Sequence, residues 1–167
     1  MALSMYQASV PVYIKLLNGA ANCLKKAAAH YADNKYDEAS LLSYRLYPDM
    51  FHFAKQVQEA TNHARNTARL AGQEPLKIEE TEKSLAGLIA RVDQTVAYLN
   101  TLKPEQIDGT EEKIITVTRR DVAVDYTGMQ FLLNRSMPNF VFHSTTAYTI
   151  LRHNGVAVGK RDFLGPN

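Results

Sequence analysis

Residues 139–151 have the sequence NFVFHSTTAYTIL and form the most informative stretch of this 167-residue chain. At about 100° per residue, one helical face gathers mostly apolar side chains: Met129, Leu132, Leu133, Ser136, Phe140, Ala147, Ile150 and Leu151. His143 lies about 40° from the centre of this face, so we expect its imidazole to point inward, with Asn139 one turn earlier at the edge. Burying either side chain without a partner costs about 1 to 3 kcal/mol. The stretch therefore predicts a helix whose buried polar groups meet another side chain, water, a metal or a ligand.

Three earlier segments also carry one apolar face at helical spacing. Their apolar positions are Val10, Ile14, Leu17, Ala21, Leu24, Ala28 and Tyr31; then Met50, Phe53, Val57, Ala60, Ala64, Ala68 and Ala71; then Leu85, Leu88, Ile89, Val92, Val96 and Leu99. The first helix is either capped by Ser4 and kinked at Pro11 or begins near Ser9. The second is expected from Pro48 to Gly72, and the third from near Thr81 to Lys103. Because only several residues link these two helices, we expect them to be antiparallel neighbours.

Residues 113–126 differ from these segments because apolar and polar side chains alternate around a polar turn, with many β-branched residues. This pattern predicts a β-hairpin. After it, Thr127 is expected to cap the fourth helix and Pro138 to bend it, and the tail 156–167 has no helical period and should lie over the surface. The fold class is therefore all-α: a four-helix bundle in a single domain, 1–167, with a small hairpin between the third and fourth helices.

Composition narrows the class of protein. The 19 basic and 17 acidic residues alternate along the chain without forming a basic face, so we expect no nucleic-acid binding. The N-terminus lacks a signal-peptide pattern and no run of about 18 apolar residues occurs, so we expect a cytoplasmic protein with no membrane partner. The single cysteine, Cys23, falls off the apolar face of the first helix and is expected to be an ordinary free thiol.

A polar stripe runs beside the apolar face of the second helix and includes Asp49, His52, Gln56 and His63. Asp49 and Gln56 lie about 60 to 80° from the apolar centre and His52 about 120° from it. We therefore predict a buried polar pocket made by Asp49, Gln56, Asn139 and His143. His30 and His63 are assigned to the surface.

Several motifs resemble one uncharacterised bacterial family of the DinB/YfiT-like superfamily. They are Pro48-Asp49-Met50-Phe51, Gln56-Val57-Gln58, Asn139-Phe140-Val141-Phe142-His143, Ala147-Tyr148, Leu151-Arg152-His153-Asn154-Gly155-Val156 and Gly159-Lys160-Arg161-Asp162-Phe163-Leu164-Gly165. The resemblance extends over nearly the whole chain. It implies a four-helix bundle that is commonly a homodimer, in a superfamily of metalloenzymes, some of which act with small thiols.

The same resemblance implies a site for a divalent metal such as Zn²⁺ or Ni²⁺, bound by one histidine of the second helix and a His-x-x-x-His pair of the fourth. His143 matches the first histidine of that pair and His52 approximately matches the second-helix ligand, but Ala147 stands where the third ligand belongs. His153 cannot replace it, since ten residues span about 15 Å of helix. Asp49 is an alternative oxygen ligand.

Two functional hypotheses follow. In the first, the bundle binds a small molecule or serves as an interaction module, and its metal site is incomplete because of Ala147. In the second, it is a metal-dependent enzyme of the hydrolase or thiol-transferase type that uses His143 and His52. The sequence does not decide whether the protein is an enzyme.

Overall fold

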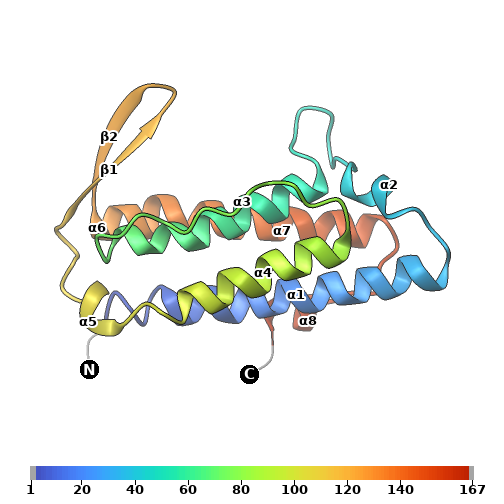
Figure 1. The fold of residues 1–167 in the computed structure, drawn as a ribbon, viewed down its shortest axis with the longest axis horizontal. Coiled ribbons are helices and arrows are strands. Elements are labelled where there is room, and N and C mark those ends of the chain that lie inside the picture. The colour runs from blue at the N-terminus through green and yellow to red at the C-terminus, as the bar shows by residue number, and fades with distance from the viewer. Residues whose placement is uncertain (1–2, 166–167) are drawn as a thin grey trace.

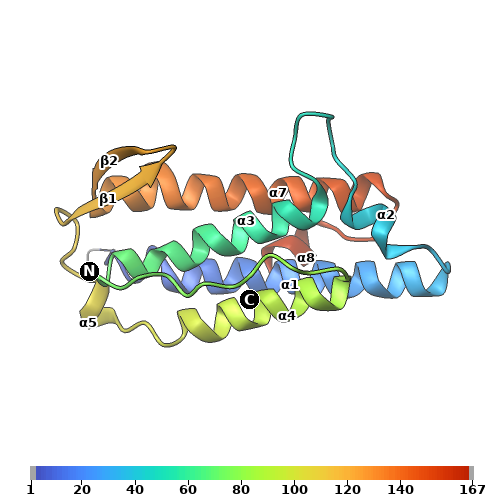
Figure 2. The same cartoon turned by 45° about the horizontal axis from the view of Figure 1, so that its top comes forward.

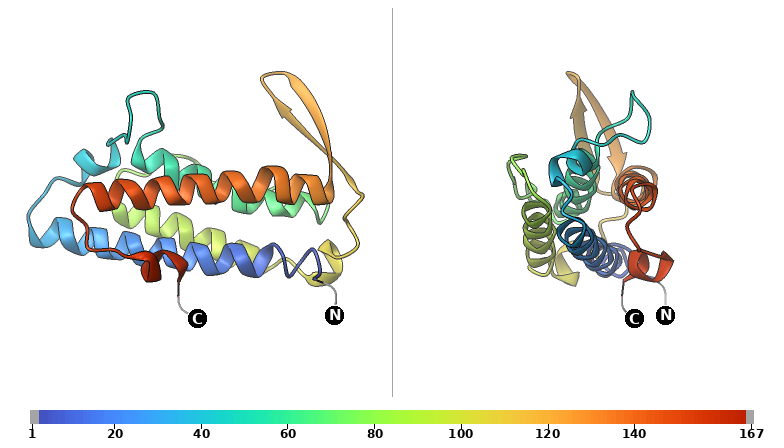
Figure 3. Two further views of the ribbon diagram at one scale, coloured as in Figure 1. Left: turned by 180° about the vertical axis from the view of Figure 1, so that it is seen from behind. Right: turned by 90° about the vertical axis from the view of Figure 1, so that its right-hand side faces the viewer.

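Four long helices pack side by side in the computed structural model, which describes residues 3–165 (Figure 1). They are α1 (Val10–Asp33), α3 (Phe53–Arg65), α4 (Leu85–Leu99) and α7 (Met137–His153). The predicted four-helix bundle is confirmed, and the end-on view in Figure 3 shows the helices around a shared interior. None of the helices in residues 3–165 combines the length and the apolar composition needed to cross a lipid bilayer.

The helix directions differ from one sequence prediction. α3 and α4 are parallel, whereas antiparallel neighbours were predicted, and residues 70–84 run back along α3 between them (Figures 1 and 2). Two hydrogen bonds show this direction, because the later residue of the segment meets the earlier residue of α3. Arg65 Nε donates to the Leu76 carbonyl at 2.8 Å, and Gln58 Nε2 donates to Glu82 Oε2 at 2.8 Å. Extended chain rises about 3.3 Å per residue against 1.5 Å in a helix, so the link is long enough to return along the whole of α3.

The second long helix also begins later than predicted. α3 begins at Phe53 instead of Pro48, because the His52 ring accepts a hydrogen bond from the Lys55 N–H at 3.3 Å and so caps the helix. The preceding link contains a short helix, α2 (Glu38–Leu42), which Asp37 caps. After α3 the chain tightens into the 3-10 turn η1 (Asn66–Arg69). The third long helix begins at Leu85, with Ser84 as its cap.

A wide turn precedes α7. Thr127 caps α6 (Gly128–Gln130), as predicted, and the chain continues through the π-helical segment η2 (Phe131–Ser136) into α7. Pro138 has no N–H to offer the preceding turn, and an i→i+5 turn holds one more residue than an α turn. The extra residue shifts the buried face, so that Phe131 is buried while Met129 and Leu133, both predicted inside, are exposed.

The core holds the apolar faces of all four helices, with Tyr13 and Phe140 in edge-to-face contact at 5.0 Å between ring centroids. The C-terminal tail, predicted to have no helix, contains the short helix α8 (Lys160–Leu164). This helix packs on α1 and covers that side of the core. Gly19 permits this close approach, because a Cβ there would lie 2.2 Å from the Phe163 carbonyl oxygen. The tail also explains why Cys23 is buried, which the helix period alone did not predict. Burial and Asp162 raise the pKa of this thiol to about 11.

The predicted hairpin is confirmed between α5 (Pro104–Ile107) and α6. Its strands β1 (Ile114–Arg119) and β2 (Val122–Thr127) are antiparallel, with Val117 opposite Val124. The hairpin projects from the end of the bundle at which α6 begins (Figures 1 and 3). It stands near the polar groups between α3 and α7, where Thr118 lines a cavity.

Candidate functional site

His143 projects from α7 toward α3 and is 8% exposed. Its Nδ1 lies 2.7 Å from Gln56 Oε1, and Gln56 Nε2 donates to the Phe51 carbonyl at 3.0 Å. Because the Gln56 amide group is oriented by that second bond, its oxygen must accept a hydrogen bond from His143 Nδ1–H. The other nitrogen of His143, Nε2, therefore keeps its lone pair free.

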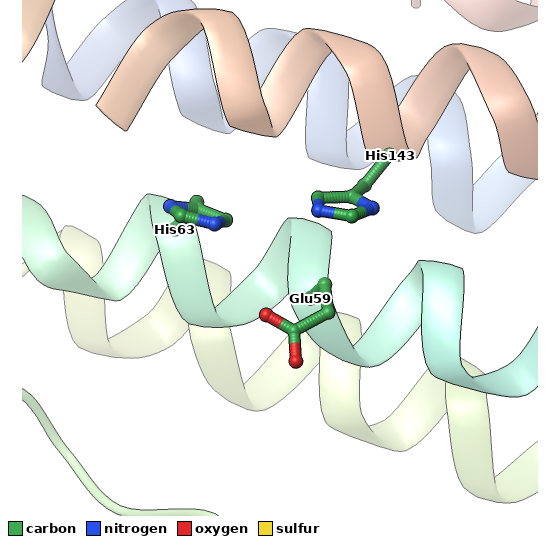
Figure 4. A group of neighbouring side chains, drawn as sticks. All are labelled: Glu59, His63 and His143. Atoms are coloured by element: carbon green, nitrogen blue, oxygen red, sulfur yellow. The ribbon is translucent and has the colours of Figure 1, made fainter. Parts of the chain in front are cut away.

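Two side chains of α3 lie beside this ring. Glu59 and His63 are four residues apart, so they occupy the same face of the helix on successive turns. Each of the three residues Glu59, His63 and His143 offers one ligand atom, and these atoms all lie within 4.8 Å of one another. Figure 4 shows the two imidazoles between α3 and α7, with one nitrogen of His143 directed toward His63 and the Glu59 carboxylate on the adjacent turn of α3.

The surroundings of both imidazoles favour the neutral form. Burial, the neighbouring His143 ring and Arg135 lower the pKa of His63 to about 4, although Glu59 opposes them. Burial also lowers the pKa of His143, against the effect of Glu59. The two ring planes differ by only 13° and their centroids are 5.7 Å apart. Neutral imidazoles retain the lone pairs that a metal ion or a proton requires.

The cluster borders a cavity of about 370 Å³. Its lining is mostly polar and comprises Phe51, Glu59, Asn62, His63, Asn66, Thr118, Arg135, Asn139 and His143. Residues from α3, η1, β1, η2 and α7 thus meet at one place. This volume lies at the lower end of the range for small-molecule sites.

The donor set fits a divalent metal ion. Two neutral imidazoles and a carboxylate are ligands of Zn²⁺ and of several transition metals, and such three-ligand sites leave a position open. At metal–ligand distances of about 2.1 Å, tetrahedral ligands lie about 3.4 Å apart, so ligand atoms that lie within 4.8 Å of one another need to close by at most about 1.4 Å. Glu59 is tethered by a 2.7 Å ion pair with Lys55, which also pairs with Glu80 at 2.7 Å. The bond from Gln56 to His143 supplies the outer hydrogen bond typical of a metal-binding histidine.

The structure brings some of the sequence-predicted residues together and separates others. Gln56 contacts His143 directly, and Asn139 lines the cavity while its amide donates to the Arg135 carbonyl at 2.7 Å. Asp49 is exposed in the turn before α3, outside the residues that line the cavity, because α3 begins four residues after it. This corrects its place in the predicted pocket.

His52 and Ala147 also lie outside the cluster. The contacts of the His52 ring are with backbone atoms, Lys55 N at 3.3 Å and Leu42 O at 3.0 Å, so its role is to cap α3. Ala147 is buried beside a separate apolar cavity of about 30 Å³. In the candidate ligand group His63 stands where the resemblance placed His52, and Glu59 offers the third possible ligand atom.

Sequence reasoning missed Glu59, His63 and Arg135. A signal was present for the first two, because a glutamate and a histidine four residues apart share a helix face, and His63 was already in the polar stripe with Gln56. His63 was assigned to the surface, yet it is half-buried. Arg135 gave no comparable signal, because its place at the cavity depends on the π-helical turn.

Comparisons with known proteins agree on one family. The family model described as "Domain of unknown function (DUF1993)" matches residues 5–164. A crystal structure of a DinB family member from Shewanella denitrificans is 34% identical in sequence, with a TM-score of 0.86, and the match covers 97% of this chain and 92% of that one. No match is found among curated proteins.

Proposed function

Since the chain belongs to the DUF1993 family, a domain of unknown function with a DinB-like fold, we propose that it binds a divalent metal through Glu59, His63 and His143. The protein uses this centre in a reaction of a small molecule that enters the adjoining cavity. The observation that carries the proposal is the convergence of three ligand atoms within 4.8 Å. The hydrogen bond from His143 to Gln56 supports it, since it leaves Nε2 free.

The position of the third ligand supports a complete site. The sequence resemblance implied a histidine at the position of Ala147, and its absence favoured an incomplete site. In the structure α3 offers two ligand atoms and α7 one, so three donors are present without a ligand at 147. An intact donor set favours the metal-dependent enzyme over the purely binding or interaction role.

The residues have distinct roles in this proposal. A bound divalent ion supplies Lewis acidity to water or to a donor atom of the substrate. Gln56 holds the His143 ring in the tautomer that presents Nε2, and Lys55 holds the Glu59 carboxylate. The Asn66 and Asn139 side chains offer amide groups along the cavity wall. The reaction class is hydrolysis or transfer to a thiol, as the superfamily resemblance implies.

The assembly and the compartment belong to the same proposal. We propose a cytoplasmic homodimer. Val141 and Phe142, which are 39% and 55% exposed on α7, support an association surface. The single free thiol, Cys23, supports a reducing compartment.

Metal binding by untagged protein tests the proposal. Isothermal titration with Zn²⁺ and Ni²⁺, together with elemental analysis, is expected to show one ion per chain. His63→Ala and His143→Ala each remove a ligand and are expected to weaken binding by at least about 100-fold. Gln56→Leu leaves the ligands but frees the His143 ring, and we expect a loss of about tenfold.

His52→Ala is the matched control, because His52 lies on the same polar stripe but contacts backbone atoms. Its metal affinity should equal that of the unmodified protein, although the lost cap costs about 1 kcal/mol of stability. Loss of metal binding in His52→Ala with retention in His63→Ala would contradict the proposed ligand set. Absence of stoichiometric metal in every preparation would contradict the proposal as a whole.

A further inference from the structure

Arg135 is a half-buried cation on the wall of the cavity. It lies in η2, and the Asn139 amide holds its backbone carbonyl. The guanidinium carbon is 5.7 Å from the centre of the Tyr126 ring, so one side of the group is covered by β2. Among the residues that the structure describes, no carboxylate lies within ion-pair distance of Arg135 and its guanidinium makes no hydrogen bond. The N–H donors of this half-buried guanidinium are therefore available to a ligand in the cavity.

The charges around the cavity also favour an anion. Among the lining side chains that the structure describes, only Glu59 and Arg135 are charged, and Glu59 is already paired with Lys55. A divalent ion at the Glu59, His63 and His143 cluster would add two positive charges to the single charges of Glu59 and Arg135, which cancel each other. The ligand that neutralises this excess must be negatively charged.

We propose that the cavity takes a small carboxylic acid whose carboxylate pairs with Arg135. The planar guanidinium matches a carboxylate with two parallel hydrogen bonds. Among the described lining residues Arg135 is the one cation, and Asn62, Asn66 and Asn139 add neutral amides, which suits a monoanionic head group better than a phosphate dianion. Phe51 also lines the cavity, with its ring stacked at 21° on His143 and 47% exposed, and so offers an apolar contact to the methylene groups of the ligand.

This inference rests on the proposed function, because the metal provides part of the positive charge, and the experiment separates the two. Zn²⁺ binding is measured first, and the zinc-loaded protein is then titrated with succinate while the imidazole proton resonances of its five histidines are followed by NMR. Succinate is expected to shift the signals of His63 and His143. Arg135→Gln is expected to weaken succinate binding by about tenfold or more, while Zn²⁺ affinity changes little.

Two further arginine variants and two probes complete the test. Arg135→Lys keeps the positive charge but loses the two parallel N–H donors of the guanidinium, so a succinate affinity between those of the unmodified protein and Arg135→Gln is expected. If Arg135→Gln does not fold, this variant tests the role of Arg135 in its place. Arg161→Gln is the control, because Arg161 is exposed on α8 and outside this cavity. The neutral diamide, succinamide, should not bind, and inorganic phosphate should bind more weakly than succinate.

The outcomes distinguish the two proposals. Equal succinate affinity in Arg135→Gln and the unmodified protein, equal binding of succinamide, tighter binding of phosphate, or no binding of succinate would each overturn the carboxylate site. If no Zn²⁺ binds, the proposed metal function fails. The same titration of the metal-free protein then decides the carboxylate site by its dependence on Arg135.

Discussion

The two sides of α3 carry polar groups of very different kinds. On the side facing α4, Arg65 of α3 meets Arg91 of α4; the two are 3% and 2% exposed, and each guanidinium nitrogen donates to a protein acceptor. Arg91 bonds Thr61 Oγ1 at 2.7 Å, Glu82 Oε1 at 2.8 Å and Asn62 Oδ1 at 2.9 Å. These contacts fasten the 70–84 segment between the parallel helices α3 and α4.

The side facing α7 leaves its polar groups incompletely bonded. His143 uses one ring nitrogen, while the His63 ring makes no hydrogen bond with the side chains and backbone that the structure describes, and both rings line an open cavity. The difference teaches how buried polar groups divide between stability and chemistry. Donors whose partners are all supplied by the chain hold the fold together, whereas lone pairs and charges left open at a cavity are available to a ligand.

The largest effect is expected on the fully bonded side. Arg91→Met removes a buried charge and leaves Glu82, whose side chain is 9% exposed, without its ion-pair partner. Breaking a buried pair in this way costs about 3 to 5 kcal/mol. We expect that loss in the free energy of unfolding measured by urea denaturation, with unchanged Zn²⁺ affinity for the molecules that remain folded.

Arg69→Met is the control for this change. Arg69 and Glu74 form a longer pair of 3.6 Å in which the Glu74 side chain is 84% exposed, and such surface pairs contribute about 1 kcal/mol or less. If Arg91→Met and Arg69→Met lowered the free energy of unfolding by the same amount, the buried network between α3 and α4 would stabilise the fold no more than a surface ion pair does.

Periodicity predicted the elements of this fold but not their directions. The four amphipathic helices and the alternating hairpin follow from residues close together in the sequence. The direction of α4 depends on Arg65 and Arg91 holding a segment that has no pattern of its own, and such contacts join residues far apart in the sequence. The shifted face before α7 depends on the π-helical turn before Pro138, which a fixed 100° period does not reproduce.

The site was partly predictable for the same reason. The inward direction expected for His143 follows from the helix period, and the structure shows it buried against Gln56. His63 lies on the same polar stripe as Gln56, but only the packing of α7 against that stripe makes it a neighbour of His143. Sequence periodicity assigns a residue to a face, whereas the tertiary arrangement decides what lies opposite that face.

The open side predicts a dependence of stability on pH. His63 has a pKa of about 4 in the folded protein against an ordinary 6.5, so the unfolded chain binds more protons between these values. Its contribution to stability is complete above pH 6.5 and is lost as the pH falls toward 4, amounting to about 2 to 3 kcal/mol. His63→Leu is expected to flatten this slope in urea denaturation of metal-free protein between pH 7 and 4.

His153→Leu is the matched control for the pH series, because His153 is exposed at the end of α7 and away from the cavity. That variant should retain the slope of the unmodified protein. An unchanged slope in His63→Leu would show that the ring is solvated, and the distinction between the two sides of α3 would weaken.

The smallest effect is expected at His143, because this ring belongs to both kinds of environment. Its Nδ1–H donates a hydrogen bond to Oε1 of Gln56, a residue that is 1% exposed, and its Nε2 lone pair remains free for a ligand. His143→Phe leaves the Gln56 oxygen without a donor at a cost of about 1 to 2 kcal/mol. In the double variant His143→Phe with Gln56→Leu the stranded oxygen is gone, so thermal or urea unfolding should show part of the loss recovered and a coupling energy of about 1 kcal/mol. If His143→Phe left the free energy of unfolding unchanged and the two changes were additive, the bond to Gln56 would contribute nothing to stability. Its role would then be only to orient the His143 ring toward a ligand.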